Sequence, residues 1–386
     1  MKIALVAPCP SPYMVGGAQR LWWGWADHMN AHTDHLVELL QLPSPEHDFF
    51  SLMGSYQQFY RLNLDHFDRV ISTKYPAWMV QHEDHHLYLQ HLLRGLYDTY
   101  TKSTDLPSLT DFNASSELVA LTHRDHCLSG AEVDRIFSLV DRVAMGATAE
   151  KTLFRFPGPL ARSIVQALDR FALAPKRIRR YATLSQTVRN RLDYFPNNVD
   201  VEILAHPSNL TIQTSDQADY FFATSRFDGP KRMDLIVKAY MQTSTSVPLK
   251  LAGVGPMLEH CKSLAASDSR IEFTGFLSNT KLAEMYANAL ATIFAPSDED
   301  LGLVTFESFA AGRPVITTVD SGGVAEHVTH RMTGWVVAPT ESALAAAIED
   351  AAQSRDNTLA MGAAAFRHVR DISWERLADW SSRSVT

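Results

Sequence analysis

The segment Ala295-Pro-Ser-Asp-Glu-Asp-Leu-Gly-Leu-Val-Thr-Phe-Glu-Ser-Phe-Ala-Ala-Gly-Arg-Pro-Val-Ile316 decides the fold class. An apolar run ends at Pro296, an acidic turn follows, and Gly302 precedes a short stretch of helical composition that Gly312 ends. A second apolar run, 314–318, comes directly afterwards. A strand, a turn, a helix and a further strand in this order predict a parallel sheet with helices on both faces.

The same alternation extends along the chain in both directions. In the second half we expect strands at 220–225, 249–252, 271–274, 291–295, 314–318 and 334–337, with helices at 233–242, 257–266, 280–289 and 342–353. In the first half we expect strands at 2–8, 36–42, 69–73, 87–91, 117–122 and 181–184, and a helix at 18–29. The fold class is therefore α/β, with two Rossmann-like doubly wound domains, 1–207 and 208–370, facing across a cleft. A helix at about 371–386 carries Trp374, Leu377 and Trp380 at helical spacing, and its return to the first domain is left open.

Composition excludes several classes of protein. The 386 residues suggest two to three domains, and 46% hydrophobic with 20% charged residues is typical of a folded globular chain. A net charge of −8 argues against a nucleic-acid binder that relies on a strong positive field. Cys9, Cys127 and Cys261 form neither a disulfide framework nor a zinc pattern. With no signal peptide and no apolar run of about 18 residues, we expect a cytoplasmic protein.

Two sets of residues in the second half predict a binding site for an anionic ligand. The amides of Gly302, Leu303 and Val304 would lie at a helix N-terminus, which suits phosphate, and Glu299 and Glu307 flank them. Carboxylates accept hydrogen bonds from vicinal hydroxyls, so a sugar on one side and a ribose on the other would fit. Separately, Arg226 and Lys231 follow the strand at 220–225, where ligands of open α/β sheets bind. Their cationic side chains can neutralise a diphosphate.

Two glycine-rich turns follow neighbouring strands. Gly253-Val-Gly255-Pro256 is half of a dinucleotide fingerprint, but the third glycine is missing, so a phosphate-proximal turn or a simple tight turn is favoured over an NAD site. Gly322-Gly323 is followed three residues later by Glu326 and offers another close backbone approach to a ligand.

Taken together, these residues resemble glycosyltransferase family 4, the retaining group 1 nucleotide-sugar transferases of the GT-B fold. The resemblance covers about 130 residues and rests on five motifs in the family's order: Arg226 with Lys231, Gly253 to Pro256, Glu299 with Glu307, Ala311 to Ile316, and Gly322 to Glu326. Gly16-Gly17 resembles the family's N-terminal glycine loop. Leu301 departs from the pattern, because many members carry an aromatic residue there, and Asp300 adds a charge.

The resemblance implies a role for each matching residue. Arg226 and Lys231 would hold the diphosphate, Glu307 the ribose hydroxyls, and Glu299 the transferred sugar. Gly16, Gly17, Gly253 and the amides of Gly302 to Val304 would approach the donor, and the backbone near Phe276 and Leu277 would face the base. No cofactor or metal is expected. The second domain would bind the donor and the first domain the acceptor.

Two residues of the first half are candidates for the acceptor side. The stretch His91-Leu-Leu-Arg94-Gly-Leu-Tyr97-Asp resembles a subgroup of the family with His-x-x-Arg-x-x-Tyr-Asp. His91, at the end of an expected strand, is a candidate for catalysis through a hydrogen bond to sugar or acceptor, and Arg94 is a candidate for phosphate or an acidic acceptor. A histidine bonded only to backbone is the open alternative.

Three other patterns have simpler explanations. The stretch His82-Glu-Asp-His-His86 formally matches the zinc-protease motif His-Glu-x-x-His, but it lies in a polar, turn-like stretch and not in a helix. Asp298-Glu-Asp300 could bind a metal in the other major glycosyltransferase fold, but the following helix and Gly-Arg-Pro turn argue against this. The basic segment 160–180 either contacts anionic lipid, as a peripheral membrane site, or packs on the core.

We therefore predict a retaining, metal-independent glycosyltransferase that moves a sugar from a UDP- or GDP-sugar to a hydroxyl on a glycan, a lipid-linked acceptor or a small molecule. Bacterial polysaccharide, lipopolysaccharide or glycoconjugate biosynthesis is the expected setting. Two alternatives stay open at this point: a nucleotide-sugar epimerase of the same fold and a non-catalytic nucleotide-sugar binder.

Overall fold

The computed structural model describes residues 1–9, 16–105, 113–122, 127–146 and 151–383. Contacts divide the chain into two compact units. The first comprises residues 1–184, 188–204 and 375 onward, and the second comprises 185–187 and 205–374. The chain passes from one unit to the other at 204/205, three residues before the boundary expected from the sequence, and it returns at 374/375.

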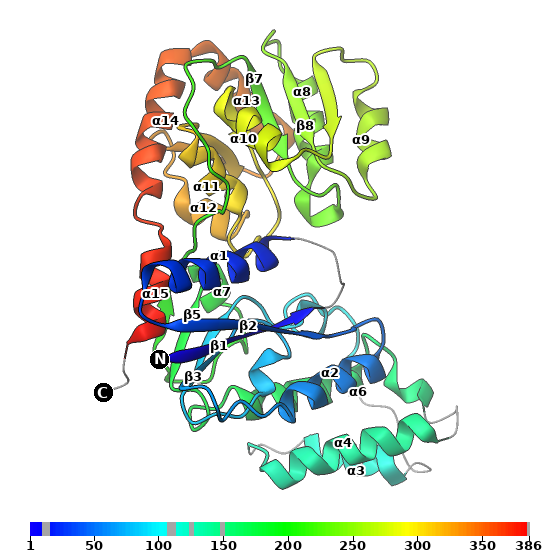
Figure 1. Ribbon diagram of the computed structural model, residues 1–386. Helices are drawn as coiled ribbons and strands as arrows, with labels where there is room; N and C mark the ends of the chain where they lie inside the picture. Colours follow the sequence, from blue (N-terminus) through cyan, green and yellow to red (C-terminus); the bar gives the residue numbers. More distant parts are fainter. Residues whose placement is uncertain (10–15, 106–112, 123–126, 147–150, 384–386) are drawn as a thin grey trace. The chain divides into compact units, whose positions relative to one another are not determined.

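The first unit contains a six-stranded parallel sheet in the order β2-β1-β3-β4-β5-β6. Figure 1 labels β1, β2, β3 and β5 of this sheet. Its strands are β1 Lys2–Cys9, β2 Leu36–Pro43, β3 Arg69–Ser72, β4 His85–Leu89, β5 Arg180–Thr183 and β6 Val201–Ile203. Its α-helices are α1 Gly17–His32, α2 Phe49–Tyr60, α3 Asn113–Thr122, α4 Gly130–Met145, α6 Pro159–Ala172 and α15 Trp374–Ser382, while α7 Gln186–Arg189 begins among residues of the second unit. Short 3-10 turns occur at η1 Ala77–Met79, η2 Arg94–Leu96 and η3 Thr152–Phe154.

The structure of this unit differs from the sequence prediction at two points. Residues 117–122, expected as a strand, form the end of helix α3. The buried Leu118 and Leu121 of this run lie three residues apart, a spacing that suits a helix face as well as a short buried strand. The strand β6 was missed because it has only three residues and carries Glu202 in its centre.

The second unit contains another six-stranded parallel sheet, in the order β12-β11-β10-β7-β8-β9. Its strands are β7 Tyr220–Thr224, β8 Leu249–Ala252, β9 Ile271–Gly275, β10 Ala289–Ile293, β11 Val315–Thr318 and β12 Gly334–Val337, and each overlaps an expected strand. The helices are η4 Gly229–Lys231, α8 Met233–Met241, α9 Leu258–Ala265, α10 Asn279–Ala287, α11 Leu303–Ala310, α12 Gly323–His327, α13 Glu341–Gln353 and α14 Arg355–Val369.

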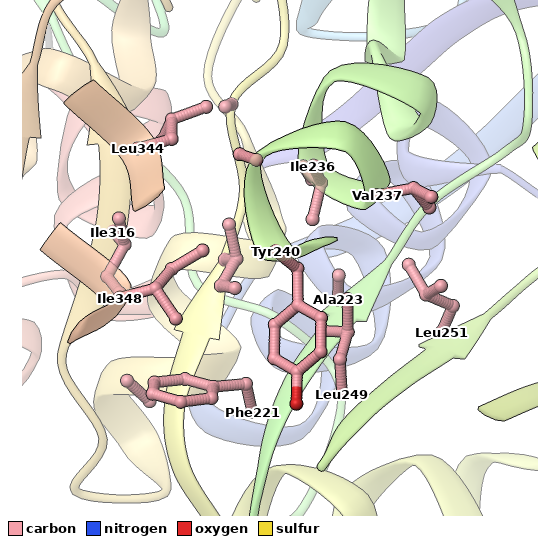
Figure 2. Close-up of a cluster of buried hydrophobic side chains, with 14 of the residues drawn as sticks. Phe221, Ala223, Ile236, Val237, Tyr240, Leu249, Leu251, Ile316, Leu344 and Ile348 are labelled. Carbon is pink, nitrogen blue, oxygen red and sulfur yellow. The ribbon is translucent and has the colours of Figure 1, made fainter. Parts of the chain in front are cut away.

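A continuous apolar core stabilises the second unit. Leu249 and Leu251 of β8 are two positions apart and therefore project from the same face of the sheet. Figure 2 shows them with Ile236 and Tyr240 of α8 and with Ile348 of α13 in one buried cluster. Burying each large side chain of this kind contributes about 1.5–3 kcal/mol. This core holds the strand ends, and thus the loops that follow them, in fixed positions.

The last helix, α15, packs within the first unit. Trp380 is fully buried, and its ring centroid lies 6.2 Å from that of Trp25 on α1. The indole Nε1 of Trp25 donates a hydrogen bond to Ser381 Oγ at 3.0 Å. The guanidinium of Arg69, at the start of β3, donates to the backbone oxygen of Arg383 at 3.0 Å. Among the described residues, no helix has both the length and the apolarity that crossing a bilayer requires.

Buried histidines predict a loss of stability in mild acid. Burial lowers the pKa of His85 to about 3 and the pKa values of His206 and His327 to about 4, because the imidazolium form is desolvated. The unfolded chain binds these protons from about pH 6.5 downward, so the free energy of unfolding should fall by about 1.4 kcal/mol per pH unit for each histidine. Asp169 acts in the opposite sense, because burial raises its pKa to about 6 in the folded state. We expect a net loss between pH 7 and 5 in urea unfolding, and equal stability at both values would contradict this account.

Candidate functional site

The sheet of the second unit has a topological switch point between β7 and β10. The chain leaves β7 toward β8 on one side, and it leaves β10 toward β11 on the other. The loops at the carboxyl ends of these two neighbouring strands therefore diverge, which is where open α/β sheets bind ligands. The loop after β7 carries Arg226 and Lys231, and the loop after β10 carries Glu299 and Gly302.

Lys231 and Glu299 meet at this switch point, although 68 residues separate them. The Lys231 Nζ lies 2.6 Å from Glu299 Oε2 and 5.8 Å from the ring centroid of Phe294. The side chains are 15% and 24% exposed, so the pair is largely shielded yet still reaches the surface. The structure thus brings together the cation expected to hold a diphosphate and the carboxylate expected to contact a sugar.

Arg226 does not join this pair. Its side chain is 73% exposed, and its Nη2 lies 3.2 Å from Asp228 Oδ2, within the same loop. The predicted role of Arg226 at a diphosphate stays a prediction, whereas Lys231 occupies a defined position.

Arg232, which the sequence analysis did not select, connects three loops of the second unit. Its guanidinium donates to the carbonyl of Ala295 at 2.8 Å, to Thr318 Oγ1 at 2.9 Å and to both oxygens of Asp320. These hydrogen bonds lower the pKa of the Asp320 carboxyl. The adjacent Lys231 is held by the same loop, so Arg232 positions it. In the sequence, only the adjacent basic residues Lys231 and Arg232 indicate a site here, and this pair does not show which of the two side chains points into the unit.

The glycine turns allow close contact between loops. A Cβ at Gly253 would overlap the carbonyl oxygen of Ser225, which excludes any other residue where the loops after β7 and β8 meet. Gly322 has φ of 63° and forms a bridge with Glu299, and the Gly323 amide donates to the Glu299 carbonyl at 2.8 Å. The structure shows the tight turn at Gly253, and its approach to a phosphate stays a prediction. Gly322 and Gly323 fix the backbone that carries the Glu299 carboxylate.

Replacing Gly322 should therefore destabilise the second unit. In Gly322→Ala the methyl group would overlap the Glu299 backbone and adopt a backbone region that side chains disfavour, so the free energy of unfolding should fall by about 1–3 kcal/mol. The matched control is Gly54→Ala in α2, where an added Cβ meets no atom within 4 Å. There the helix should gain about 0.5–1 kcal/mol. Urea unfolding measures both, and a Gly322→Ala protein as stable as the control would refute the packing argument.

Helix α11 begins beside the same pair. Gly302 is its N-cap with φ of 80°, and Leu303 and Val304 are its first two residues. The first amides of a helix have no intrahelical acceptor and favour an anion. The predicted position of Gly302, Leu303 and Val304 at a helix N-terminus is therefore found in the structure, and their contact with a donor stays a prediction.

Glu307, on α11, is held in a buried hydrogen-bond network. It is 5% exposed, and its Oε1 accepts from Ser208 Oγ at 2.7 Å, while its Oε2 accepts from Tyr286 OH at 2.7 Å. Ser208 belongs to the segment that enters the second unit, and Tyr286 belongs to α10, where it packs edge-on against Phe222. Sequence spacing selected Glu307 but neither of its partners.

Phe276 and Leu277 follow β9 directly. The side chain of Phe276 is highly exposed, whereas Leu277 packs against a small cluster that contains Phe222 and Tyr286. They therefore lie at the carboxyl edge of the sheet, at a loop that neighbours Gly253, whose amide donates to the Gly275 carbonyl at 2.8 Å.

The candidates of the first unit have local partners. His91 lies two residues beyond the end of β4, so it does not close that strand, and its Nδ1 is 2.7 Å from the carbonyl of Leu92. Arg94 begins η2 and its Nη2 lies 2.8 Å from Asp98. Gly16 and Gly17 are exposed at the start of α1, and the loop before them lies outside the described residues.

The zinc-protease match and the basic segment both lie in elements that pack within the first unit. His82 precedes strand β4 and His86 lies within it, so no helix presents the zinc-protease pair. The part of the chain that the structure describes has no group of three metal-ligating side chains. In the basic segment, Arg177 stacks on Phe171 and Arg179 donates to the carbonyl of Glu83, and Arg180 pairs with Glu202. These contacts show that the segment packs on neighbouring elements, and its contact with lipid stays a prediction.

Comparison with known proteins agrees with this geometry. Residues 211–368 match the sequence model of the family described as glycosyl transferases group 1. A GDP-mannose-dependent alpha-(1-6)-phosphatidylinositol monomannoside mannosyltransferase of Mycobacterium tuberculosis is 34% identical over 169 residues, which are 40% of this chain and 44% of the relative. The chain thus covers less than half the length of this curated relative.

Two solved structures resemble the whole chain. Sucrose-phosphate synthase from Thermosynechococcus elongatus has a TM-score of 0.64 at 15% identity, with 98% of this chain and 96% of that chain covered. HepE from Anabaena, solved in complex with UDP, has a TM-score of 0.59 at 14% identity, with 98% of each chain covered. The fold is therefore that of the GT-B glycosyltransferases. Within it, the match to the group 1 glycosyl transferase model covers most of the second unit.

Proposed function

We propose that this protein is a retaining glycosyltransferase of family 4, which transfers a sugar from a nucleoside diphosphate sugar to a hydroxyl acceptor. The observation that carries the proposal is the shielded contact between Lys231 and Glu299 at the β7/β10 switch point, next to the N-terminus of α11. A diphosphate needs positive charge, and the sugar attached to it needs hydrogen-bond acceptors. This pair supplies both within 3 Å of each other.

The chemistry follows from the charges. As the bond between the anomeric carbon and the diphosphate breaks, negative charge develops on the phosphate oxygens. The ammonium of Lys231 and the first amides of α11 stabilise that charge, and they need no metal to do so. Glu299 would accept hydrogen bonds from the sugar and keep Lys231 in place. The acceptor hydroxyl attacks from the face that the diphosphate leaves, its proton passes to the departing phosphate, and the anomeric configuration is retained.

The ribose would bind at Glu307. In the structure, a serine hydroxyl and a tyrosine hydroxyl already donate to its two oxygens. A ribose hydroxyl carries the same donor group as Ser208, so it can take the acceptor position on Oε1 that Ser208 fills. Tyr286 would then keep Oε2 and fix the orientation of the carboxylate.

Tyr286→Phe should weaken donor binding more than turnover. The variant removes one hydroxyl and leaves Glu307 with one donor fewer, so KM for the donor should rise roughly 3- to 10-fold, as expected for one buried hydrogen bond. The kcat should change less than twofold, because Tyr286 touches no reacting atom. Tyr220→Phe is the matched control, since its hydroxyl bonds to the Met285 carbonyl, away from Glu307. Equal KM values for both variants would refute the role of Tyr286 in orienting Glu307 for the donor.

The names of the relatives indicate which donors to test first. The mycobacterial relative is named for GDP-mannose, and the Anabaena structure was solved with UDP, so GDP- and UDP-sugars are the donors to test first. We propose a glycan, a lipid-linked acceptor or a small hydroxylated molecule as acceptor, in bacterial polysaccharide, lipopolysaccharide or glycoconjugate biosynthesis. The cytoplasmic location remains a prediction.

The test is a transfer assay on the full chain. UDP-, GDP- and ADP-sugars are incubated with the protein and with a panel of methyl glycosides, with and without EDTA, and nucleoside diphosphate release is measured. Acceptor-dependent release that EDTA does not abolish is expected. The product should carry the anomeric configuration of the donor, as determined by NMR. An inverted product, or isomerised sugar formed without acceptor, would refute the proposal.

A further inference from the structure

A cavity of about 430 Å³ lies in the first unit, between helix α6 and the segment 193–197. One side is a single stripe of α6, and the other side comes from the facing segment. The stripe consists of Gln166, Asp169, Arg170 and Leu173, and Tyr194, Phe195 and Asn197 are among the residues that face it. The volume lies within the range of small-molecule sites. None of these residues takes part in the proposed transfer.

The floor of the cavity contains a buried carboxylate. Asp169 is 1% exposed, and its Oδ1 accepts hydrogen bonds from Tyr56 OH at 2.9 Å and Trp78 Nε1 at 2.8 Å. Its Oδ2 accepts one, from Tyr97 OH at 2.8 Å. A carboxylate has about four acceptor positions, so among the described residues these three donors leave one position, on Oδ2.

The charge on this carboxylate favours a ligand that donates a hydrogen bond. Burial raises the pKa of Asp169 to about 6, and the hydrogen bonds from Trp78, Tyr97 and Tyr56 oppose this rise, so the group is mainly ionised at neutral pH. All three hydrogen-bond partners are neutral, and the nearby Arg170 guanidinium also lowers the pKa of Asp169. A buried anion attracts a further donor strongly, because little solvent screens it.

The residues that line the cavity determine which kind of hydrogen-bonding ligand fits. Tyr97 and Tyr194 lie edge to face, with ring centroids 6.1 Å apart, and with Phe195 they offer apolar ring surface. The amides of Gln166 and Asn197 can both donate and accept, as a hydroxyl group can. The exposed guanidinium of Arg170 opposes a cationic ligand. Apolar ring surface together with a carboxylate and amides matches a molecule with an apolar face and several hydroxyls.

We propose that this cavity binds the ring of a neutral sugar, with one hydroxyl donating to Asp169 Oδ2 and the apolar face of the ring against the aromatic wall. The binding requires neither a nucleotide nor turnover, so it goes beyond the transfer reaction and can be tested independently of it.

The experiment is saturation-transfer NMR on the full chain without nucleotide. The probes are methyl α-D-mannopyranoside, methyl α-D-glucopyranoside and methyl α-D-galactopyranoside. At least one should bind to the wild type. Asn197→Trp, which places a large side chain at the exposed rim, should abolish binding. Leu192→Trp, just before the segment 193–197 and outside the cavity lining, should leave binding unchanged. Gln166→Ala should weaken it roughly fivefold, the effect of one lost hydrogen bond.

The possible outcomes separate this proposal from the transfer reaction. If none of the three glycosides receives saturation from the wild type, or if Asn197→Trp binds as well as Leu192→Trp, the sugar site is refuted. Binding of putrescine to the wild type with no sugar binding would assign a cation site and also overturn the proposal. Sugar binding with no transfer would contradict the proposed function alone, and thermal unfolding confirms that each variant is folded.

Discussion

Lys231→Ala should lower kcat for sugar transfer by roughly 100- to 1000-fold, the effect of removing one preorganised group that stabilises charge in a transition state. The ammonium lies at the switch point, 2.6 Å from Glu299, and its side chain is largely shielded. Its removal leaves the departing diphosphate without this ammonium, while the amides at the start of α11 remain. The fold should tolerate the change, because a partly exposed ion pair contributes little to stability.

The control for this variant is Lys238→Ala on α8. Lys238 pairs with Asp234 at 3.2 Å, one turn away on the same helix, and its side chain is more exposed. It should retain turnover within about twofold of the wild type, as expected for a surface ion pair. If Lys231→Ala kept near-normal turnover, or if both variants lost activity equally, Lys231 would have no special role.

Trp380→Ala should lower the free energy of unfolding of the first unit by about 3–5 kcal/mol, the range for removing a buried tryptophan. The indole is fully buried, and it contacts Trp25, Tyr88 and His86. Its loss would leave a cavity under α15 and would loosen the hydrogen bond between Trp25 and Ser381.

Trp23→Ala on α1 is the matched control for this prediction. Its side chain is 40% exposed, so the same chemical change removes far less buried surface. Urea unfolding of the two variants should differ by at least about 2 kcal/mol. A Trp380→Ala protein no less stable than the control would show that α15 is not part of the core.

The fold of the second unit could be predicted well because its pattern is local. Its strands are short buried runs such as Leu249–Ala252, bounded by glycine or proline and separated by amphipathic stretches. The secondary structure of the first unit was harder to predict. The apolar residues within 117–122 have a spacing that fits both a helix and a strand. A six-residue run does not distinguish the two periods.

The positions of the site residues could be predicted only where those residues directly follow a predicted strand. Because ligands of a doubly wound sheet bind beyond the carboxyl ends of strands, Lys231 and Glu299 could be placed at one edge before their contact was known. Sequence spacing could not show that Arg232 turns inward while Arg226 turns outward, because that choice depends on the loops after β10 and β11. It also could not pair Glu307 with Tyr286 and Ser208, which lie 21 and 99 residues away.

Isothermal titration of the full chain with UDP, GDP and ADP tests the central claim most directly. At least one of the three should bind to the wild type, and Lys231→Ala should weaken that affinity about 10-fold or more, the loss of one charge-assisted contact to phosphate. If no nucleoside diphosphate binds, or if the variant binds as tightly as the wild type, the switch point between β7 and β10 does not hold a diphosphate.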